Sequence, residues 1–483
     1  MFLGSGVPAA FGSAFAVNEL GARAQGMGGA FTAIADDASA LFFNPAGLAF
    51  QKGTNFQMEA LAINGQFRFV PSDTPPGAVV PEKGFSGAIG QPFIPVASMY
   101  FSRRMSERWS LGFALYTPNG LAANFTNFND GDPSHTKFVG RWAGSRAMLR
   151  QFWFQPTVAV RLSQNHAISV GVAAVHTHLF LEQSFLNPYE DPDEFGLRLA
   201  KDVFPGADPV AAYRSFARLL PEGRLRAAAT SNRPGFAGGY LYRNPNSGFS
   251  LGLNYRSPVV SRLKGDAAFS FTNEGALVPF LPKDQTLDIL FPNQPITGTF
   301  VTPATYVVGV AKNGVAGGTL AFDFRMQDFQ RFRDIPLNFS QTVDANGEEI
   351  GTPPERRLVF DFRNSYLIHA GYERPFGSGG PMRKMLAGAT WRAGYVFDYT
   401  PVVEKSVGPL FPDATRHSWT AGMTKPVGSF DMTFFYQFMQ FMNRTTNVAA
   451  NNFQFTNGEY RNFANLIGLG MRWRVGGHDG RME

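Results

Sequence analysis

Apolar and polar residues alternate along several well-separated stretches of this 483-residue chain, and this period of two is the feature that most constrains the fold. In FSLGLNYRS (residues 249–257), apolar residues at every second position alternate with small or polar ones, and a β-strand would place the two sets on opposite faces. The same alternation runs through TLAFDFRMQ (319–327), WRAGYVFDY (391–399) and IGLGMRWRV (467–475). No run of about 18 apolar residues is present, so the sequence predicts strands and not membrane-spanning helices.

A soluble sheet with one wet face also alternates in this way, so the number of strands and their connections must decide. Fourteen candidate strands begin near Thr54, Ile94, Trp109, Arg150, His166, Ala227, Gly248, Pro303, Gly317, Arg363, Gly388, Thr415, Ser429 and Asn462. Connections after the even-numbered strands are mostly short, such as RRMSE and KPVG, whereas those after the odd-numbered strands are long, including residues 261–302 and 330–362. This parity predicts an all-β fold, a 14-stranded antiparallel transmembrane β-barrel with periplasmic turns and external loops.

The composition limits the function classes. Charged residues make up 17% and aromatic residues 14% of the chain, which has 52 glycines and no cysteine. The lack of cysteine excludes disulfides and thiolate metal sites, and it is consistent with export through an oxidising periplasm. The net charge of +6 is scattered without a basic stripe or a nucleic-acid-binding motif, so no nucleic-acid partner is expected.

Seven segments occur in the order typical of one family. They are FAVNELGARAQGMGGAFTAIADDASALFFNPAGLA, LYTPNGLAANF, FVGRW, LGLNYRSPV, PATYVVGVA, RAGYVFDYTPV and GPLFPDATRHSWTAGM. In this order they resemble the FadL/TodX family of outer-membrane transporters for long-chain fatty acids and hydrocarbons, from about Phe15 to Val475. The resemblance implies a fourteen-stranded barrel with an N-terminal hatch, or plug, folded into its lumen.

The resemblance also implies domains and site residues. Residues 1–12 would be the remnant of an export signal, 13–53 the hatch, 54–475 the barrel with its long loops, and 476–483 a polar tail. The N-terminus of the hatch would include Phe15, Val17, Asn18 and Glu19. The hatch motif would be Asn44, Pro45 and Ala46, lying against an inward kink in the third strand, residues 109–118.

Two long connections are unusually apolar. The first predicts an amphipathic helix, because apolar residues recur there at helical spacing. Candidate residues for a ligand groove in the two connections are Tyr213, Phe216, Leu220, Phe280, Leu281, Leu290 and Phe291. Facing each other, these loops would capture lipid-like molecules, or they would pack together and close the barrel mouth, and both roles are compatible.

Arginines on the polar face of the strands are candidates to bind a substrate carboxylate. Those in the expected lumen include Arg161, Arg256, Arg325 and Arg392. They would otherwise belong to a lumen charge network with acids such as Asp323 and Asp398. The histidines lack a carboxylate at ligand spacing or a nucleophile on the same strand face, so we expect no catalytic residue, metal or cofactor.

Together, the alternation, the loop parity and the resemblance predict a monomeric protein of the cell outer membrane. We expect passive uptake of long-chain fatty acids or other hydrophobic compounds, by capture in the loop groove, passage past the hatch and lateral exit into the membrane. The expected partners are a hydrophobic small molecule and the outer-membrane lipid, including lipopolysaccharide. A general hydrophilic porin and, less favoured, a lipid-modifying outer-membrane enzyme are the alternatives. The sequence does not choose between a fatty acid and a hydrocarbon as substrate.

Overall fold

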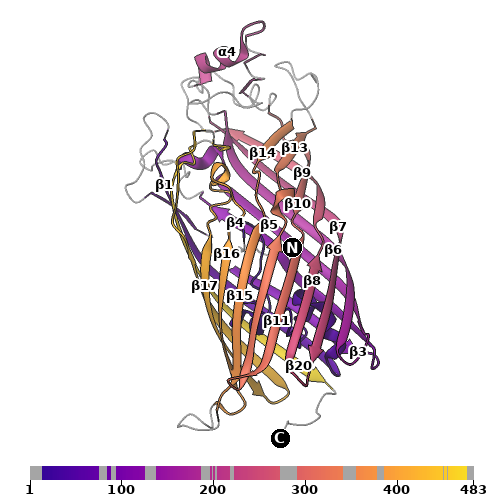
Figure 1. Ribbon diagram of the computed structural model, residues 1–483. Coiled ribbons are helices and arrows are strands. Elements are labelled where there is room, and N and C mark those ends of the chain that lie inside the picture. Colours follow the sequence, from indigo (N-terminus) through magenta and orange to yellow (C-terminus); the bar gives the residue numbers. More distant parts are fainter. Residues whose placement is uncertain are drawn as a thin grey trace.

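The computed structural model describes residues 13–74, 84–88, 94–125, 138–186, 196–197, 200–201, 204–217, 222–271, 291–340, 355–377, 386–449, 451–453 and 455–475. These residues contain twenty strands joined in one sheet (Figure 1). The strands are β1 (Thr54–Pro71), β2 (Phe85–Ala88), β3 (Ile94–Arg104), β4 (Trp109–Asn124), β5 (Arg146–Arg161), β6 (His166–Phe185), β7 (Gly223–Asn244), β8 (Phe249–Arg256), β9 (Val259–Phe271), β10 (Gln294–Thr302), β11 (Thr305–Val315), β12 (Gly318–Gln327), β13 (Asp334–Phe339), β14 (Glu355–Val359), β15 (Ser365–Pro375), β16 (Thr390–Tyr399), β17 (Arg416–Val427), β18 (Phe430–Phe441), β19 (Arg444–Thr446) and β20 (Gly458–Val475).

The sheet closes into a barrel of fourteen antiparallel wall strands. β1 and β20 pair along their whole lengths, from Thr54 opposite Val475 to Pro71 opposite Gly458, so neither end of the sheet is left open. Four wall strands are each broken into two pieces, namely β8 with β9, β10 with β11, β12 with β13, and β14 with β15. The short strands β2 and β19 add to β1 and β20. The predicted strand count is therefore confirmed.

Two predicted loops were wrong in extent. Residues 261–302 contain most of β9 and all of β10, and residues 330–362 contain β13 and β14. Pro258 separates β8 from β9, and Pro303 separates β10 from β11. Proline interrupts a ladder of backbone hydrogen bonds, so each of these prolines predicts the end of a strand. In the structure the wall strand bends at the proline and continues beyond it.

Alternation along the strands separates an apolar outer wall from a polar inner one. On β12, Phe322 and Phe324 are 46% and 47% exposed, whereas Asp323 and Arg325, which alternate with them, are buried. Long connections and the helix α4 (Pro209–Phe216) lie at one end of the barrel and short turns at the other (Figure 1). This arrangement is typical of an outer-membrane barrel, whose apolar band faces lipid.

Residues 13–53, called the hatch below, pack against the inner face of the wall strands. The hatch contains α1 (Ala22–Gly26), α2 (Ala40–Phe43) and the 3₁₀-helix η1 (Pro45–Phe50). It contacts strands all round the barrel, from β4 to β7 through η1 and from β16 to β20 through α1. The other helices are η3 (Val139–Trp142), α4, η5 (Phe329–Arg331) and η6 (Glu404–Ser406), and no helix of the described residues is long and apolar enough to cross a bilayer.

Candidate functional site

Asn44 ties the hatch to the barrel wall. Its Nδ2 donates hydrogen bonds to Thr32 O and to Tyr240 O of β7, both 2.9 Å long. Its Oδ1 accepts a hydrogen bond of 3.2 Å from Ala46 N. Pro45 begins η1, a position where its missing N–H sacrifices no helical hydrogen bond. One fully buried amide thus joins two hatch segments to the wall.

Inward-facing glycines allow this close approach of hatch and wall. A Cβ added at Gly239 would lie 2.2 Å from Asn44 Oδ1, and one added at Gly394 would lie 2.2 Å from Gly28 N. A Cβ at Gly371 would meet Met27 O at 2.3 Å. These distances are too short for any side chain, which explains why glycine recurs on the inner face of the strands.

The third wall strand, β4, leaves its neighbour β3 halfway up the wall. The two strands pair from Arg104 opposite Ser110 to Met99 opposite Leu115 and, among the described residues, no further. The register of β4 on β5 shifts between Tyr116 and Asn119. The shift therefore lies at the end of residues 109–118, the stretch predicted to carry a kink, and extends one residue beyond it. Beyond this point β4 is buried on both faces up to Ala123. We call this region, between residues 94–98 of β3 and 116–124 of β4, the open seam.

The N-terminus of the hatch takes the place of β3 along the open seam. Ala16 forms an antiparallel bridge with Asn119. Val17 N donates to Pro118 O, and Gly120 N donates to Phe15 O, each at 2.8 Å. The resemblance places the Asn-Pro-Ala turn against the kink. In the structure Asn44 bonds to β7, η1 also contacts β4, and Phe15–Val17 lie along the kink.

An apolar cavity lies on the loop side of this contact. It measures about 30 Å³, and its lining comes from strands β4 to β7, β10, β13 and β14 and from residues 410–411. Lining residues include Leu121, Leu149, Leu181, Ile296, Leu358 and Phe411. Phe15 packs on Phe300, Phe329 and Phe332, each with its ring centroid 5.1 Å away. The hatch N-terminus therefore borders the cavity, and Leu121 connects the cavity to the open seam.

A buried charge cluster holds the start of the hatch. Ser13 Oγ donates to Asp398 Oδ1 at 2.5 Å, and Ala14 N donates to Asp413 Oδ2 at 3.0 Å. Arg416 forms ion pairs with both aspartates. Asp413 lies in the connection between β16 and β17, where burial raises the pKa of its carboxyl group although Arg416 opposes this. The first hatch residues are thus fixed by two carboxylates that share one guanidinium.

Asn18 and Glu19 continue this polar contact. Asn18 Oδ1 accepts a hydrogen bond of 2.6 Å from Arg325 Nη1, and Glu19 Oε2 accepts one of 3.0 Å from Asn18 N. Burial raises the pKa of Glu19 to about 7, against the opposing effect of Arg416. The residues that were predicted as the hatch N-terminus therefore lie together between the aromatic floor of the cavity and the arginines of the wall.

The four arginines predicted to face the lumen have different surroundings. Arg256 Nη2 donates to Phe42 O at 3.0 Å, and its guanidinium lies 4.3 Å from the centroid of the Phe42 ring. Arg325 approaches the same ring at 6.0 Å. Arg392 instead pairs with Glu373 at 2.9 Å, and Arg161 bonds to turn carbonyls at the far end of β5. Only the first two are therefore near the open seam.

Arg256 also faces the kinked strand. Its guanidinium lies 5.5 Å from the Tyr116 ring and 5.7 Å from the Trp153 ring, and these two rings stack at 6.1 Å. In the described part of the chain neither Arg256 nor Arg325 forms an ion pair, and the Nε of each has no hydrogen-bond partner. Sequence reasoning missed Tyr116 and Trp153, although Pro118 in LYTPNG marks the irregular strand that orients them.

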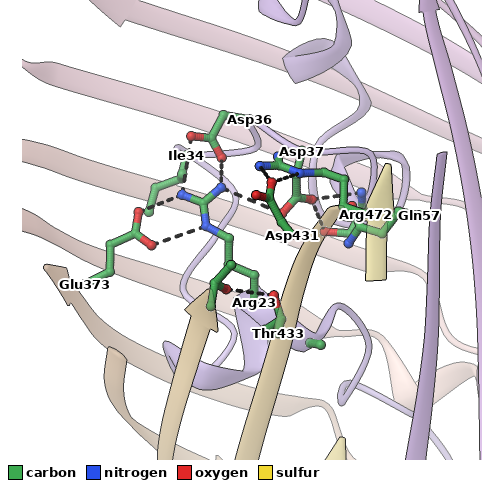
Figure 2. A network of polar contacts seen from close by, with 12 residues as sticks. Arg23, Ile34, Asp36, Asp37, Gln57, Glu373, Asp431, Thr433 and Arg472 are labelled. Atoms are coloured by element: carbon green, nitrogen blue, oxygen red, sulfur yellow. Dashed lines mark hydrogen bonds and ion pairs between the residues drawn. The ribbon is translucent and has the colours of Figure 1, made fainter. Parts of the chain in front are cut away.

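On the turn side of the hatch the lumen is polar. A cavity of about 800 Å³ is lined by charged residues of the hatch and of β1, β15, β16, β18 and β20. In the polar network of Figure 2, Arg23 pairs with Asp36 and, at 2.7 Å, with Glu373, while Arg472 pairs with Asp431 at 2.6 Å. Arg23 was not predicted as a site residue, although it is the one basic residue of the hatch before Lys52.

The predicted loop groove is described only in part. Tyr213 and Phe216 lie in α4, where their rings are 5.9 Å apart, and Phe216 also contacts Phe204. Phe291 packs on Phe185, 5.2 Å away, at the loop end of β6. Leu220, Phe280, Leu281 and Leu290 lie outside the described residues. A groove between the two loops stays a prediction.

A closed fourteen-stranded barrel with an apolar outer wall and a plugged lumen defines an outer-membrane β-barrel protein. A family model described as "Outer membrane protein transport protein (OMPP1/FadL/TodX)" matches residues 4–475, and the chain belongs to this family. It is therefore an outer-membrane transporter of hydrophobic compounds and not an enzyme. No curated protein sequence matches the chain.

Solved structures show the same fold at low identity. A FadL homologue from Pseudomonas aeruginosa superposes with a TM-score of 0.72 at 16% identity, covering 95% of this chain and 99% of that one. The CymD monoaromatic hydrocarbon channel gives 0.65 at 16% identity, with 97% and 100% covered. The toluene transporter TodX of P. putida gives 0.64 at 15% identity, with 97% and 99% covered.

Proposed function

We propose that this protein takes up long-chain fatty acids or other hydrophobic compounds passively and releases them sideways through the open seam. The observation that carries the proposal is the departure of β4 from β3 beside the apolar cavity, where Phe15–Val17 replace the missing partner strand. A short hatch segment, held by two backbone hydrogen bonds to β4, thus stands between the cavity and the lipid-facing wall.

The energetics favour this route for an apolar solute. Each CH₂ group that moves from an apolar cavity into water loses about 0.8 kcal/mol. A straight path through the lumen leads past the hatch into the charged turn-side cavity of about 800 Å³. Exit through the open seam leads from the apolar cavity directly toward the acyl chains of the membrane lipids, so the apolar substrate stays out of water.

Two further steps complete the route, capture at the loop end and enlargement of the cavity. The aromatic residues Tyr213 and Phe216 of α4 are proposed to help capture the substrate at the loop end. The apolar cavity of about 30 Å³ is too small for a long chain, so its side chains must move apart when a substrate enters. Displacement of Phe15 from the floor is the proposed rearrangement that enlarges the cavity and opens the seam.

Uptake measured with and without the protein tests the proposal. Cells that make the protein are expected to accumulate a labelled long-chain fatty acid, a labelled alkylbenzene or both in a saturable manner, because the apolar cavity binds a limited number of molecules. A labelled disaccharide is the control for a hydrophilic pore, and it is expected to enter at the background rate. Free passage of the disaccharide without protein-dependent uptake of either apolar compound would contradict the proposed function.

Arg256 and Arg325 are proposed as the partners of a substrate carboxylate. Both are buried beside the open seam, and no acid of the described residues pairs with either. A hydrogen bond between charged groups contributes about 1.5–3 kcal/mol, which is about tenfold to a hundredfold in affinity. A fatty acid would gain this interaction and an alkylbenzene would not.

The Arg256→Gln variant is expected to raise the half-saturating concentration of fatty-acid uptake at least about tenfold and to leave alkylbenzene uptake unchanged. Asn254 also donates to Phe42 O, at 3.2 Å, so a contact between β8 and the hatch remains when the charge of Arg256 is lost. Arg161→Gln is the matched control, since Arg161 donates to turn carbonyls at the end of β5 and lies against the Phe50 ring, away from the open seam. An equal loss of fatty-acid and alkylbenzene uptake would show that Arg256 stabilises the hatch and does not bind a substrate carboxylate.

A further inference from the structure

The outer wall carries a basic patch where β5, β6, β7 and β9 rise above the apolar band. We define the basic patch as Arg150, His176, His178, Arg262 and Lys264. Register places Arg150 opposite His178, His178 opposite Thr230, and Thr230 opposite Lys264, so one row of side chains crosses four strands. These positions alternate with the buried ones in the same way as Phe154, Val172, Phe236 and Val260, which are exposed apolar residues on the outer face of the wall.

The charge of this wall is strongly one-sided. Arg262 and Lys264 are exposed and form no ion pair in the described part of the chain. Further toward the loops, Arg226 pairs with Glu182 at 2.9 Å, and Asp266 is the other acid on this outer face. Toward the loop ends of β16, β17 and β18, the outward positions are instead occupied by Tyr399, His417 and Gln440.

We propose that the basic patch binds the phosphate groups of lipid A, the membrane anchor of lipopolysaccharide, in the outer leaflet. Two observations select this partner. The patch lies at the end of the barrel with the long loops, which faces the outside in an outer-membrane protein. It also directly borders the lipid-facing apolar residues, at the depth where a headgroup and not a soluble ligand is found. Arginine and lysine are the side chains suited to phosphate.

The position of the patch relates it to the transport route. β5 is the neighbour of β4, and Gln151 of β5 lies opposite Asn119 of the kink, one residue from Arg150. A lipid held by the patch would therefore border the open seam on its β5 side. This inference needs only the orientation of the barrel, so it does not depend on the proposed function.

Titration of the purified full-length protein with lipid A tests the proposal. The probe is lipid A with both phosphates, offered in micelles of a neutral detergent, and dephosphorylated lipid A and phosphatidylglycerol are the comparison lipids. The wild-type protein is expected to bind the phosphorylated form at least tenfold more tightly than either comparison lipid. Arg262→Gln with Lys264→Gln is expected to weaken this binding about 30-fold.

A matched control variant distinguishes binding at the basic patch from a general effect of the positive charge of the protein. Arg357→Gln with Arg461→Gln also removes two outward-facing arginines near the loops, but each of these already pairs with an acid, Asp334 or Glu459. This variant is expected to bind like the wild type, and circular dichroism checks that both variants are folded. Undiminished binding by the patch variant, equal loss in the control, or equally tight binding of either comparison lipid would each overturn the proposal. Should the double variant not fold, Arg262→Gln alone is expected to weaken binding about fivefold.

Discussion

A disulfide between Cys residues introduced by Ala16→Cys and Asn119→Cys is expected to abolish uptake, and a reducing agent is expected to restore it. Ala16 and Asn119 face each other in the bridge between hatch and β4, flanked by hydrogen bonds from Val17 N and Gly120 N. This pattern marks a non-hydrogen-bonded antiparallel pair, whose Cα atoms lie about 4.5 Å apart, within disulfide range. The oxidised variant would hold Phe15 on the cavity floor and keep the seam closed. Fatty-acid uptake before and after reduction measures the effect.

The chain is well suited to this experiment because it contains no cysteine, so no other disulfide can form. Reduction of the same variant controls for the lost hydrogen bond between Asn119 and Gln151. Ala311→Cys with Ala321→Cys is the matched control, since these residues face each other on β11 and β12 away from the seam. If the oxidised hatch variant transports as fast as its reduced form, the substrate does not need the seam to open.

The two cavities differ in polarity, and this difference favours exit of an apolar substrate on the loop side of the hatch. The loop-side cavity is lined almost entirely by leucine, isoleucine, alanine and phenylalanine. The turn-side cavity is lined by ion pairs such as Arg23 with Glu373 and Arg392 with Glu373. Because a charged lining gives an apolar chain no favourable burial, the hatch separates a compartment that favours the substrate from one that does not.

Features with a local signature could be predicted from the sequence. The period of two and the short turns are properties of neighbouring residues, so the fourteen wall strands and their faces were predicted correctly. The inward positions of Arg256, Arg325 and Arg392 follow from the same parity. The bends at Pro258 and Pro303 were misread because proline ends a ladder locally even when the strand resumes beyond it.

Features that depend on contacts between distant residues could not be predicted in the same way. The pairing of Phe15–Val17 with β4 joins segments about a hundred residues apart in the sequence, and no local pattern encodes it. The basic patch likewise forms only when register aligns β5, β6, β7 and β9, because its residues are scattered along the chain. The partners of Asn44 were missed for the same reason, although its motif was recognised from the resemblance.

Loss of the Asn44 side chain is expected to uncouple the hatch from β7. In Asn44→Ala, Thr32 O, Tyr240 O and Ala46 N lose their partner in a fully buried place, and each unpaired group costs about 1–3 kcal/mol. We expect fatty-acid uptake to fall about tenfold or more and the entry of a labelled disaccharide to rise above background. Adding Pro45→Ala, which frees the backbone at the start of η1, is expected to enlarge both effects. Uptake of the two labelled compounds by the same cells measures the change.

Asn457→Ala is the matched control for this prediction. Asn457 is also a buried asparagine, but its amide bonds to the backbone N and O of Val448 at the loop end and not to the hatch. This variant is expected to lose stability without changing the ratio of fatty-acid to disaccharide entry, because the hatch stays attached to the wall. A ratio that changes equally in both variants would assign the effect to general weakening of the barrel, and an unchanged ratio in Asn44→Ala would show that the amide does not hold the hatch.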